Sequence, residues 1–277
     1  MQVRAAAKIN LNLRVLGRNA ATGFHDIETW MTPVTLADEL RIELAGPPGI
    51  RLLCSDPDLD SGPSNLAWRA VRAFIDATGF HGGVEISLDK RIPHGAGLGG
   101  GSSDAAAVLV ALNTLAGEPL EFNALMSLAA SLGSDVPFFV RGLAAVATGR
   151  GERVEPRPLP RPLDLLLLKP AFPVATAWAY AQWSVGLRSP ASWVAPQSLE
   201  GMEIVNDLEG PVFAKHLLLP VIKQWLLRHA LVAAAAMSGS GCCLFAVLRD
   251  PGDAAALAAE ARATFGAGLW TAACKTT

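Results

Sequence analysis

Residues 93–103 form a glycine-rich segment that is suited to binding phosphate groups. Five of the eleven residues in Pro93-His-Gly-Ala-Gly-Leu-Gly-Gly-Gly-Ser-Ser103 are glycine, and glycine lets a ligand approach the backbone closely. An alanine-rich run without breakers follows and predicts a helix over residues 104–116. The first N–H groups of a helix lack partners, and its dipole is positive there. The segment therefore predicts an anion cradle, in which two serine hydroxyls can bind phosphate oxygens or Mg²⁺.

Other interpretations of this segment are less favoured. Gly95-x-Gly97-x-x-Gly100 matches the dinucleotide fingerprint, but that fingerprint expects its turn directly after a strand. Here residues 89–94 separate the strand from the loop. A simple helix cap would not need five glycines. The chain has no Gly-Lys-Ser/Thr motif of a Walker loop and no His-Arg-Asp or Asp-Phe-Gly motif of a protein kinase. A nicotinamide-dependent oxidoreductase thus stays a weaker alternative.

Two further motifs accompany the glycine-rich segment. They are Lys8-Ile-Asn-Leu-Asn-Leu13 near the N-terminus and Met237-Ser-Gly-Ser-Gly241 before an apolar run in the second half. The three motifs, in this order, resemble those of the GHMP kinases, which are named for galactokinase, homoserine kinase, mevalonate kinase and phosphomevalonate kinase. This resemblance implies an ATP-dependent small-molecule kinase. It also implies an α+β, two-domain GHMP kinase fold with the active site in the interdomain cleft.

Within the family, the motifs are most similar to those of the branch that acts on a cytidine diphosphate-linked methylerythritol. The segments that carry this similarity are Ala7–Leu13, Gly23–His25, Ser64–Leu66, Lys90–Pro93, Gly133–Phe138 and Asn206–Glu209. The similarity implies phosphorylation of the 2-hydroxyl of 4-diphosphocytidyl-2-C-methyl-D-erythritol, a step of non-mevalonate isoprenoid precursor biosynthesis. A kinase of homoserine or mevalonate type is the nearest alternative, and Gly23-Phe-His25 speaks against it.

The resemblance assigns the catalytic roles to Lys8 and Asp135. Phosphoryl transfer needs positioning, charge neutralisation and a group that takes the hydroxyl proton. Asp135 lies in a short turn after an apolar helix and is the candidate base. Lys8 would keep this aspartate ionised and bind the acceptor oxygen. Taken singly, they would be a turn aspartate and a solvated strand lysine. A non-catalytic sensor that kept the nucleotide fold would not need both.

The resemblance also implies how ATP is bound. The expected nucleotide-binding residues are Asn65, Lys90, Pro93, His94, Gly95, Ala96, Gly97, Leu98, Gly99, Gly100, Gly101, Ser102 and Ser103. Of these, Lys90 has a plain alternative as a solvated strand end. Mg²⁺ is expected to bridge the nucleotide phosphates, and no protein side chain is assigned to it.

The acceptor substrate is expected to contact Asn10, Phe24, His25 and Tyr180. A cytosine ring needs a flat stacking partner and a hydrogen bond to its edge. Phe24 stands where the family usually has tyrosine, so it keeps the stack and loses a hydroxyl. Without the resemblance, His25 would be a surface loop residue and Tyr180 a core aromatic.

Hydrophobic periodicity predicts the elements that must position these residues. Residues 3–16 alternate, which predicts a strand with Lys8 and Asn10 on its polar face. Other strands are expected at 39–45, 50–54, 84–88, 144–148, 163–168, 242–248 and 268–274. Helices are expected at 64–78 with Ser64 as cap, 104–116, 121–132, 175–185, 219–230 and 253–264. Loops are expected at 17–25 and 189–196, and a strand or loop at 232–241.

Composition limits the remaining classes of protein. The chain has 277 residues, of which 51% are hydrophobic and 17% charged, with a net charge of −2. A folded core is expected, and nucleic acid or an anionic membrane is not an expected partner. The sequence shows no signal-peptide core, no membrane-spanning stretch and no disulfide or zinc spacing among its four cysteines. A cytoplasmic protein with reduced thiols is expected.

A proline-rich connector divides the chain. Prolines at 156, 158, 160 and 162 stiffen this segment, and domain boundaries fall in such linkers. We therefore expect an N-terminal ATP-binding domain over 1–158 and a C-terminal domain over 159–277.

Overall fold

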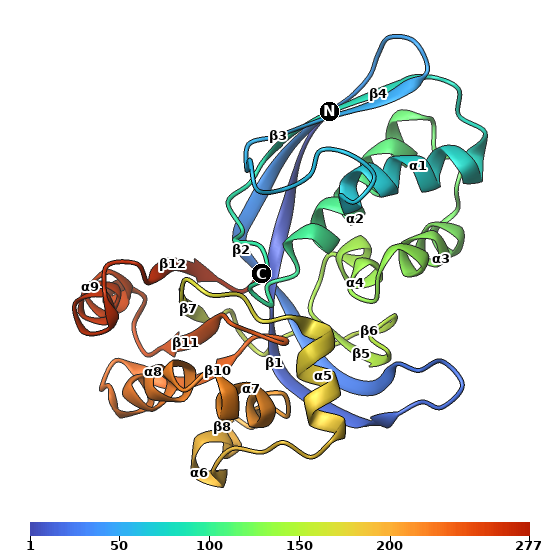
Figure 1. Cartoon of the computed structure of the whole chain (residues 1–277). Helices are drawn as coiled ribbons and strands as arrows, with labels where there is room; N and C mark the ends of the chain where they lie inside the picture. The colour runs from blue at the N-terminus through green and yellow to red at the C-terminus, as the bar shows by residue number, and fades with distance from the viewer.

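Two β-sheets and nine helices make up the computed structural model, which describes all 277 residues (Figure 1). The first sheet has the order β3-β4-β2-β1-β9-β8, and β5 and β6 extend it from β2. Its strands are β1 (Gln2–Arg18), β2 (His25–Leu44), β3 (Gly49–Cys54), β4 (Gly83–Asp89), β5 (Ala145–Gly149), β6 (Arg153–Pro156), β8 (Gln197–Leu199) and β9 (Met202–Asn206). The expected mixture of strands and helices in both halves is confirmed.

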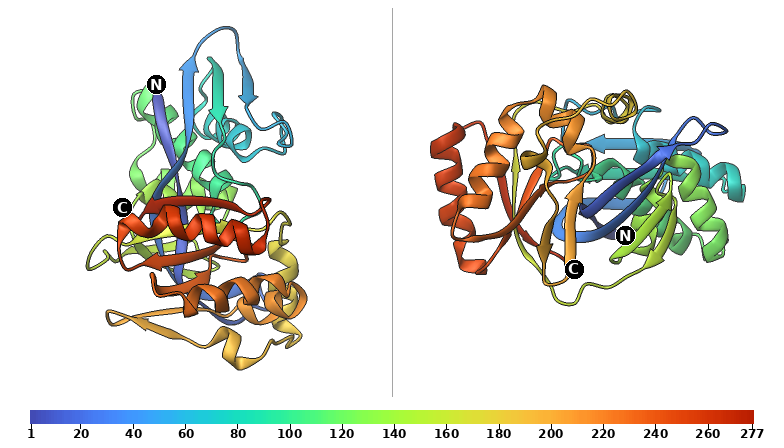
Figure 2. Two further views of the ribbon diagram at one scale, coloured as in Figure 1. Left: turned by 90° about the vertical axis from the view of Figure 1, so that its left-hand side faces the viewer. Right: turned by 90° about the horizontal axis from the view of Figure 1, so that it is seen from below.

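The second sheet has the order β10-β11-β7-β12. Its strands are β7 (Asp164–Lys169), β10 (Val232–Met237), β11 (Leu244–Leu248) and β12 (Trp270–Lys275). The helices are α1 (Leu66–Thr78), α2 (Gly100–Leu115), α3 (Phe122–Leu132), α4 (Val136–Arg141), α5 (Thr176–Ser184), α6 (Ala191–Val194), α7 (Glu209–Lys215), α8 (Leu218–Arg228) and α9 (Ala254–Phe265). Helices α8 and α9 cover the outer face of this sheet (Figure 2).

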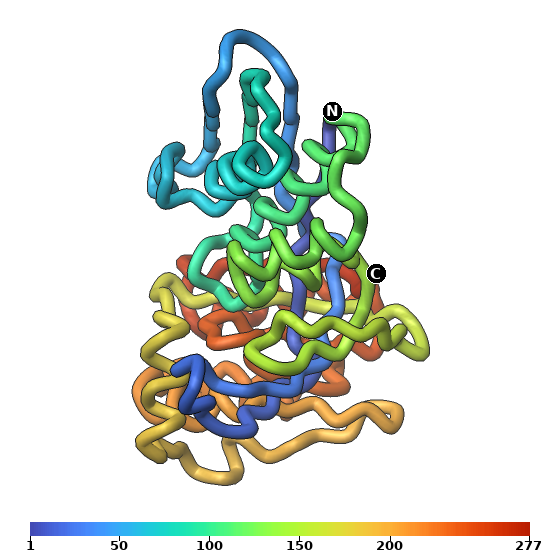
Figure 3. Tube along the Cα trace, turned by 90° about the vertical axis from the view of Figure 1, so that its right-hand side faces the viewer, coloured from blue at the N-terminus to red at the C-terminus, as the bar shows by residue number.

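The long hairpin of β1 and β2 connects the two halves of the molecule. Strand β2 pairs with β4 through residues 39–44 and with β5 through residues 27–31. Strand β1 pairs in parallel with β9, where Asn12 lies opposite Val205. The free end of the hairpin lies beside the segment that contains α5 (Figure 3). One sheet thus contains strands from both sides of residue 158, and the division into 1–158 and 159–277 stays a prediction.

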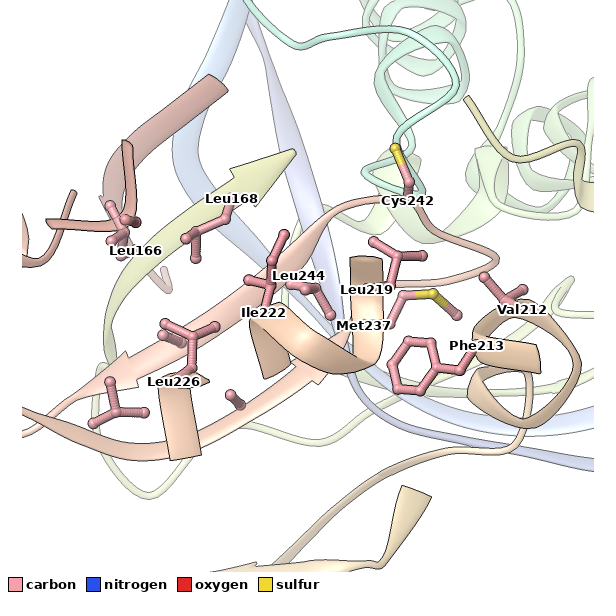
Figure 4. Packing of buried hydrophobic residues seen from close by; sticks show 14 of the residues in the cluster. Leu166, Leu168, Val212, Phe213, Leu219, Ile222, Leu226, Met237, Cys242 and Leu244 are labelled. Carbon is pink, nitrogen blue, oxygen red and sulfur yellow. The ribbon is translucent and has the colours of Figure 1, made fainter. Parts of the chain in front are cut away.

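A large apolar core joins the second sheet to its helices. One cluster contains Leu166 and Leu168 of β7, Phe213 of α7, Ile222 of α8 and Met237 at the end of β10 (Figure 4). The same cluster includes residues of β1 and β2. Burial of such side chains contributes about 1.5–3 kcal/mol each, so this core fixes the hairpin against the C-terminal half.

Several predicted elements need correction. Asn65, not Ser64, is the N-cap of α1, because its side chain accepts a hydrogen bond from the Ala67 N–H at 2.9 Å. Helix α2 begins at Gly100 rather than residue 104, and β2 begins at His25 rather than residue 39. Helix α6 lies in the predicted loop 189–196. The elements absent from the prediction are β6, β8, β9, α4 and α7, which are too short to show a hydrophobic period.

The four cysteines are unpaired. Cys242, Cys243 and Cys274 are buried, and Cys54 is half-buried. None of the helices combines the length and the apolar character that crossing a membrane would need.

Candidate active site

A cavity of about 1150 Å³ lies where the two halves of the chain meet. Its wall is formed by the glycine-rich loop, the β1–β2 hairpin, the first turns of α1 and α2, helix α5 and the turn at 239–241. Every residue that the sequence analysis assigned to catalysis or binding lines this cavity, except Ser103. Residues far apart in the sequence therefore share one site.

The glycine-rich loop is held between β1 and the Met237–Gly241 turn. The Lys8 N–H donates to the Leu98 carbonyl at 3.0 Å, and the Cys243 N–H donates to the Ala96 carbonyl at 3.0 Å. The Ser238 hydroxyl donates to the Gly97 carbonyl at 3.0 Å. These three bonds fix the loop from two sides, so its free N–H groups have a defined direction.

Glycine is required at position 97 by both conformation and space. Its φ is +76°, a region that residues with a side chain rarely adopt. A methyl group there would overlap the Ser238 carbonyl oxygen and lie 3.0 Å from the Gly241 nitrogen. The close approach of two glycine-containing turns thus depends on the absence of a side chain.

Ser103 does not reach the cavity, contrary to expectation. Successive helix residues point about 100° apart, because a turn contains about 3.6 residues. Since α2 begins at Gly100, Ser102 faces the cavity, whereas Ser103 points into the core and is 2% exposed. The Ser103 N–H also donates to the Gly99 carbonyl at 2.9 Å. Ser102 is the hydroxyl available to a phosphate.

Lys8 and Asp135 lie side by side in the cavity. Lys8 Nζ is 4.0 Å from Asp135 Oδ2, and the two side chains are 3% and 35% exposed. Burial lowers the pKa of Lys8, and the Asp135 carboxylate opposes that shift. Asp135 precedes α4 but makes no capping bond with its side chain. Its carboxylate is therefore free to accept a hydrogen bond from a substrate hydroxyl.

Asn10 orients Lys8. Its Oδ1 accepts a hydrogen bond from Lys8 Nζ at 2.5 Å, and its Nδ2 donates to Thr29 Oγ1 at 2.8 Å. Thr29 in turn donates to the Asn12 carbonyl at 2.6 Å. Asn10 is 3% exposed, so the polar face of β1 is enclosed rather than solvated. Asn12 is structural, because its Oδ1 accepts from the Trp30 N–H at 2.7 Å.

Lys90 is not a solvated strand end. Its Nζ lies 2.5 Å from Asp38 Oδ2 and 2.7 Å from Asp104 Oδ2, and its side chain is 5% exposed. Burial raises the pKa of Asp104 to about 7, against the pull of the Lys90 charge. Asp38 Oδ1 accepts from the Arg91 and Ile92 N–H groups. The Lys90 ammonium is thus already bound, and it anchors the start of the loop.

Asn65 and His94, which were also predicted to bind the nucleotide, differ in whether their side chains are free to bind a ligand. Asn65 uses both ends of its side chain, since its Nδ2 donates to the Asp60 carbonyl at 2.8 Å while its Oδ1 caps α1. His94 is 55% exposed, with Nδ1 3.8 Å from Asp56. Asn65 therefore shapes the wall, whereas His94 can turn toward a ligand.

Aromatic side chains line the other end of the cavity. The His25 and Tyr180 rings lie 5.1 Å apart between centroids, and His25 Nε2 is 2.5 Å from Ser184 Oγ. Phe24 is 53% exposed and stands at the opening. Burial and the nearby Arg18 charge lower the pKa of His25. At neutral pH its imidazole is uncharged and offers one donor and one acceptor.

The Asn206–Glu209 segment, to which the sequence assigned no role, supports the second glycine turn. Asn206 Nδ2 donates to the carbonyls of Met237 at 2.7 Å and Gly239 at 2.8 Å. Glu209 Oε1 accepts from the Met237 N–H at 2.8 Å, and its Oε2 is paired with buried Lys223 at 2.5 Å. The supported turn lies against the catalytic pair, because a methyl group added at Gly239 would come within 3.0 Å of Lys8 Nζ. Asn206 and Glu209 therefore also fix the wall beside Lys8.

Comparison with known proteins identifies the family. Residues 65–143 match the N-terminal domain of GHMP kinases, and residues 195–267 match the C-terminal domain. The 4-diphosphocytidyl-2-C-methyl-D-erythritol kinase of Methylacidiphilum infernorum is 42% identical over 270 residues, which are 96% of this chain and 93% of that protein. This chain is a GHMP kinase. It is therefore an ATP-dependent small-molecule kinase, as the motifs predicted.

Solved structures agree with this assignment. A crystal structure of 4-(cytidine 5'-diphospho)-2C-methyl-D-erythritol kinase has a TM-score of 0.80 and 37% identity, and the alignment covers 100% of this kinase and 99% of that chain. The homoserine kinase of Cytophaga hutchinsonii has a TM-score of 0.63 at 18% identity, covering 98% and 94% of the two chains. The second likeness shows the common fold alone, and together they confirm the predicted GHMP kinase fold.

Sequence reasoning missed several side chains of the kinase cavity. Thr29, Asp104, Arg150, Thr176 and Ser184 all line it. Asp104 follows Ser103 directly, so its place at the start of α2 could have been noticed. The others lie in segments without a motif, and only the pairing of β2 with β5 and the position of α5 bring them to the site.

Proposed function

We propose that this kinase transfers the γ-phosphate of ATP to the 2-hydroxyl of 4-diphosphocytidyl-2-C-methyl-D-erythritol, giving the 2-phosphate and ADP. The observation that carries this proposal is the continuity of the cavity. One end has the phosphate loop, the middle has Lys8 and Asp135, and the other end has Phe24, His25 and Tyr180. A substrate with a nucleobase at one end and a hydroxyl at the other fits this arrangement.

Asp135 acts as the base in this proposal. Its carboxylate accepts the proton of the acceptor hydroxyl as the oxygen attacks the γ-phosphorus. Lys8 lies 4.0 Å away and donates to the same oxygen, which steadies its developing negative charge. The bond from Asn10 fixes the direction of the ammonium group. The reaction therefore needs no movement of charged groups over long distances.

The phosphates of ATP bind at the loop and the first turn of α2. The N–H groups at the start of a 16-residue helix attract anions. Ser102 adds a hydroxyl at this point. Lys90 acts indirectly, by holding Asp38 and Asp104 under the loop, and Asn65 and Pro93 shape the wall beside the nucleotide base.

Mg²⁺ fits the oxygen atoms at this end of the cavity. The chain has no group of three or more His, Cys, Asp or Glu side chains that could hold a metal ion. Mg²⁺ commonly takes one or two protein oxygens together with substrate phosphates and water. Ser102 offers a hydroxyl, and Asp104 Oδ1 is buried with no hydrogen-bond partner. The bound ion would neutralise charge on the transferred phosphate.

The cytosine ring stacks between Phe24 and Tyr180 in this proposal, and His25 binds its edge. Because Nε2 is bound to Ser184, Nδ1 of the uncharged imidazole is left to make one hydrogen bond with that edge. Ser184 holds the other side of the histidine, which sets its orientation. This chemistry gives the site a means of selecting cytidine over acceptors that lack a base.

We also propose the division into domains 1–158 and 159–277, with the cleft between them as the active site. The proline-rich connector at 156–162 supports it. Unpaired thiols suit a reducing compartment, so we propose a cytoplasmic location.

An acceptor panel tests the function. Release of ADP would be measured with Mg·ATP and one of three acceptors: the cytidyl-methylerythritol, homoserine or mevalonate. Turnover with the first alone supports the proposal. Turnover with homoserine or mevalonate instead would keep the kinase and overturn its substrate. NADH fluorescence titration is a second check, because tight NADH binding without ADP release would favour the dinucleotide alternative.

A further inference from the structure

Arg150 lines the half of the cavity that is proposed to bind the acceptor, which extends from Phe24 to Asp135. Its guanidinium carbon lies 5.4 Å from the centroid of the Phe24 ring. The next residue, Gly151, lies against the catalytic aspartate, since a side chain there would come within 3.8 Å of Asp135 Oδ1. Arg150 lines the cavity itself. Arg150 and Gly151 therefore belong to the stretch of wall that joins Phe24 to Asp135.

The Arg150 side chain is fixed in place yet keeps donors free. One guanidinium nitrogen donates to the Ala130 carbonyl at 2.6 Å, and the ring of Phe24 supports the cation. Glu152 accepts from the Arg150 backbone N–H at 2.8 Å, and its carboxylate forms a long ion pair with Arg150 Nε at 3.9 Å without a hydrogen bond between the two side chains. A guanidinium has five N–H donors, so most of them remain available to a ligand.

The two lysines that line the cavity are already bound to other groups. Lys8 is bound to Asn10 and faces Asp135, and Lys90 is paired with Asp38 and Asp104. The negative charge of the Asp135 carboxylate would repel an anionic group of the substrate placed beside it. An anionic group between the base-binding end and Asp135 thus needs a separate cation. Arg18 also lines the cavity, but it lies beside His25 at the base-binding end. Arg150 is the cation whose neighbour Gly151 lies against Asp135.

We propose that Arg150 binds the diphosphate that links the nucleoside to the rest of the acceptor. This inference rests on the proposed function, because that acceptor carries a diphosphate between its base and its reactive hydroxyl. Arginine suits the task, since its planar fork pairs with two phosphate oxygens at once. Arg150 then makes the site selective for a nucleoside diphosphate over the free nucleoside.

Calorimetric titration with cytidine and with CDP tests this role. The protein is first saturated with Mg²⁺ and a non-hydrolysable ATP analogue, so that the phosphate loop cannot bind CDP. We expect Arg150→Met to weaken CDP binding roughly 10- to 100-fold, the effect of one charge-assisted pair. Cytidine binding should change by less than about threefold, because the contact with Phe24 is partly exposed. Arg150→Lys should lie between the wild type and Arg150→Met.

Arg153→Met is the matched control. It removes the same charge three residues away, from a side chain that is 77% exposed and outside the cavity. Its CDP affinity should equal that of the wild type. In steady-state kinetics, Arg150→Met should raise KM for the acceptor and leave KM for ATP unchanged.

Three outcomes would overturn the inference. Equal loss of cytidine and CDP binding in Arg150→Met would show that the side chain only supports Phe24. No loss of either would show that the diphosphate binds elsewhere. If the wild type binds neither ligand, the proposed function fails and the role of Arg150 fails with it. The first two outcomes leave the proposed function intact, so the two failures can be told apart.

Discussion

Replacing Gly97 with alanine tests whether the two glycine turns must touch. The φ of +76° places this residue in the left-handed region, and a methyl group would overlap the Ser238 carbonyl oxygen. The left-handed conformation costs a residue with a side chain about 1–2 kcal/mol. Overpacking in a close-packed region adds about 1–3 kcal/mol. Gly97→Ala should therefore destabilise the protein by about 2–5 kcal/mol.

Gly101→Ala is the matched comparison. Gly101 belongs to α2, has no positive φ, and a methyl group would lie 3.6 Å from Leu66 Cδ1, an ordinary contact. Alanine is favoured over glycine inside helices by about 1 kcal/mol. The same substitution four positions later should thus stabilise the protein slightly.

Urea denaturation of the two variants measures both effects. The free energy of unfolding should fall for Gly97→Ala and should stay level or rise for Gly101→Ala. We also expect Gly97→Ala to raise KM for ATP, because the loop must move away from Ser238. The reasoning is refuted if the two variants have the same stability, since the contact between the turns would then carry no constraint.

Two further predictions concern buried charges. Lys8→Met should lower kcat by about 10²- to 10⁴-fold, while ATP affinity measured by fluorescence changes little; an unchanged kcat would remove Lys8 from the mechanism. Lys223→Met should cost about 3–5 kcal/mol at neutral pH, because Glu209 is left charged and buried. Burial already raises the pKa of Glu209 in the folded protein, so the folded state binds a proton more readily than the unfolded state. The loss of stability in Lys223→Met should therefore shrink as pH falls toward 4, where Glu209 becomes protonated and uncharged. Adding Glu209→Gln should restore stability and remove this pH dependence, and a pH-independent loss would contradict the assignment.

The phosphate-binding end of the cavity could be predicted from the sequence, because the residues that form it are neighbours along the chain. Five glycines before an uninterrupted helix indicate an anion cradle from neighbouring residues alone. The exact start of α2 was not predictable, because glycine has low helix propensity and only tertiary contacts draw Gly100 into the helix. That difference of four residues decided the orientation of Ser103.

The catalytic pair and the acceptor end depend on long-range contacts. Nothing in the local sequence brings Lys8 to Asp135, and the family resemblance supplied that expectation. Lys90 was expected to bind nucleotide, with a solvated strand end as the alternative, because only the fold brings Asp38, 52 residues away, and Asp104 to its ammonium group. Arg150 was missed for the same reason, since it depends on the pairing of β5 with β2 to reach Phe24.

The most direct test of the central claim follows the phosphate itself. ³¹P NMR of a reaction with Mg·ATP and the cytidyl-methylerythritol would be recorded for the wild type and for Asp135→Asn. We predict a new phosphate ester at the 2-hydroxyl with the wild type, and formation slowed about 10²- to 10⁴-fold in the variant, with ATP binding retained. An ester formed equally fast by both proteins, or none formed by the wild type, would contradict the account.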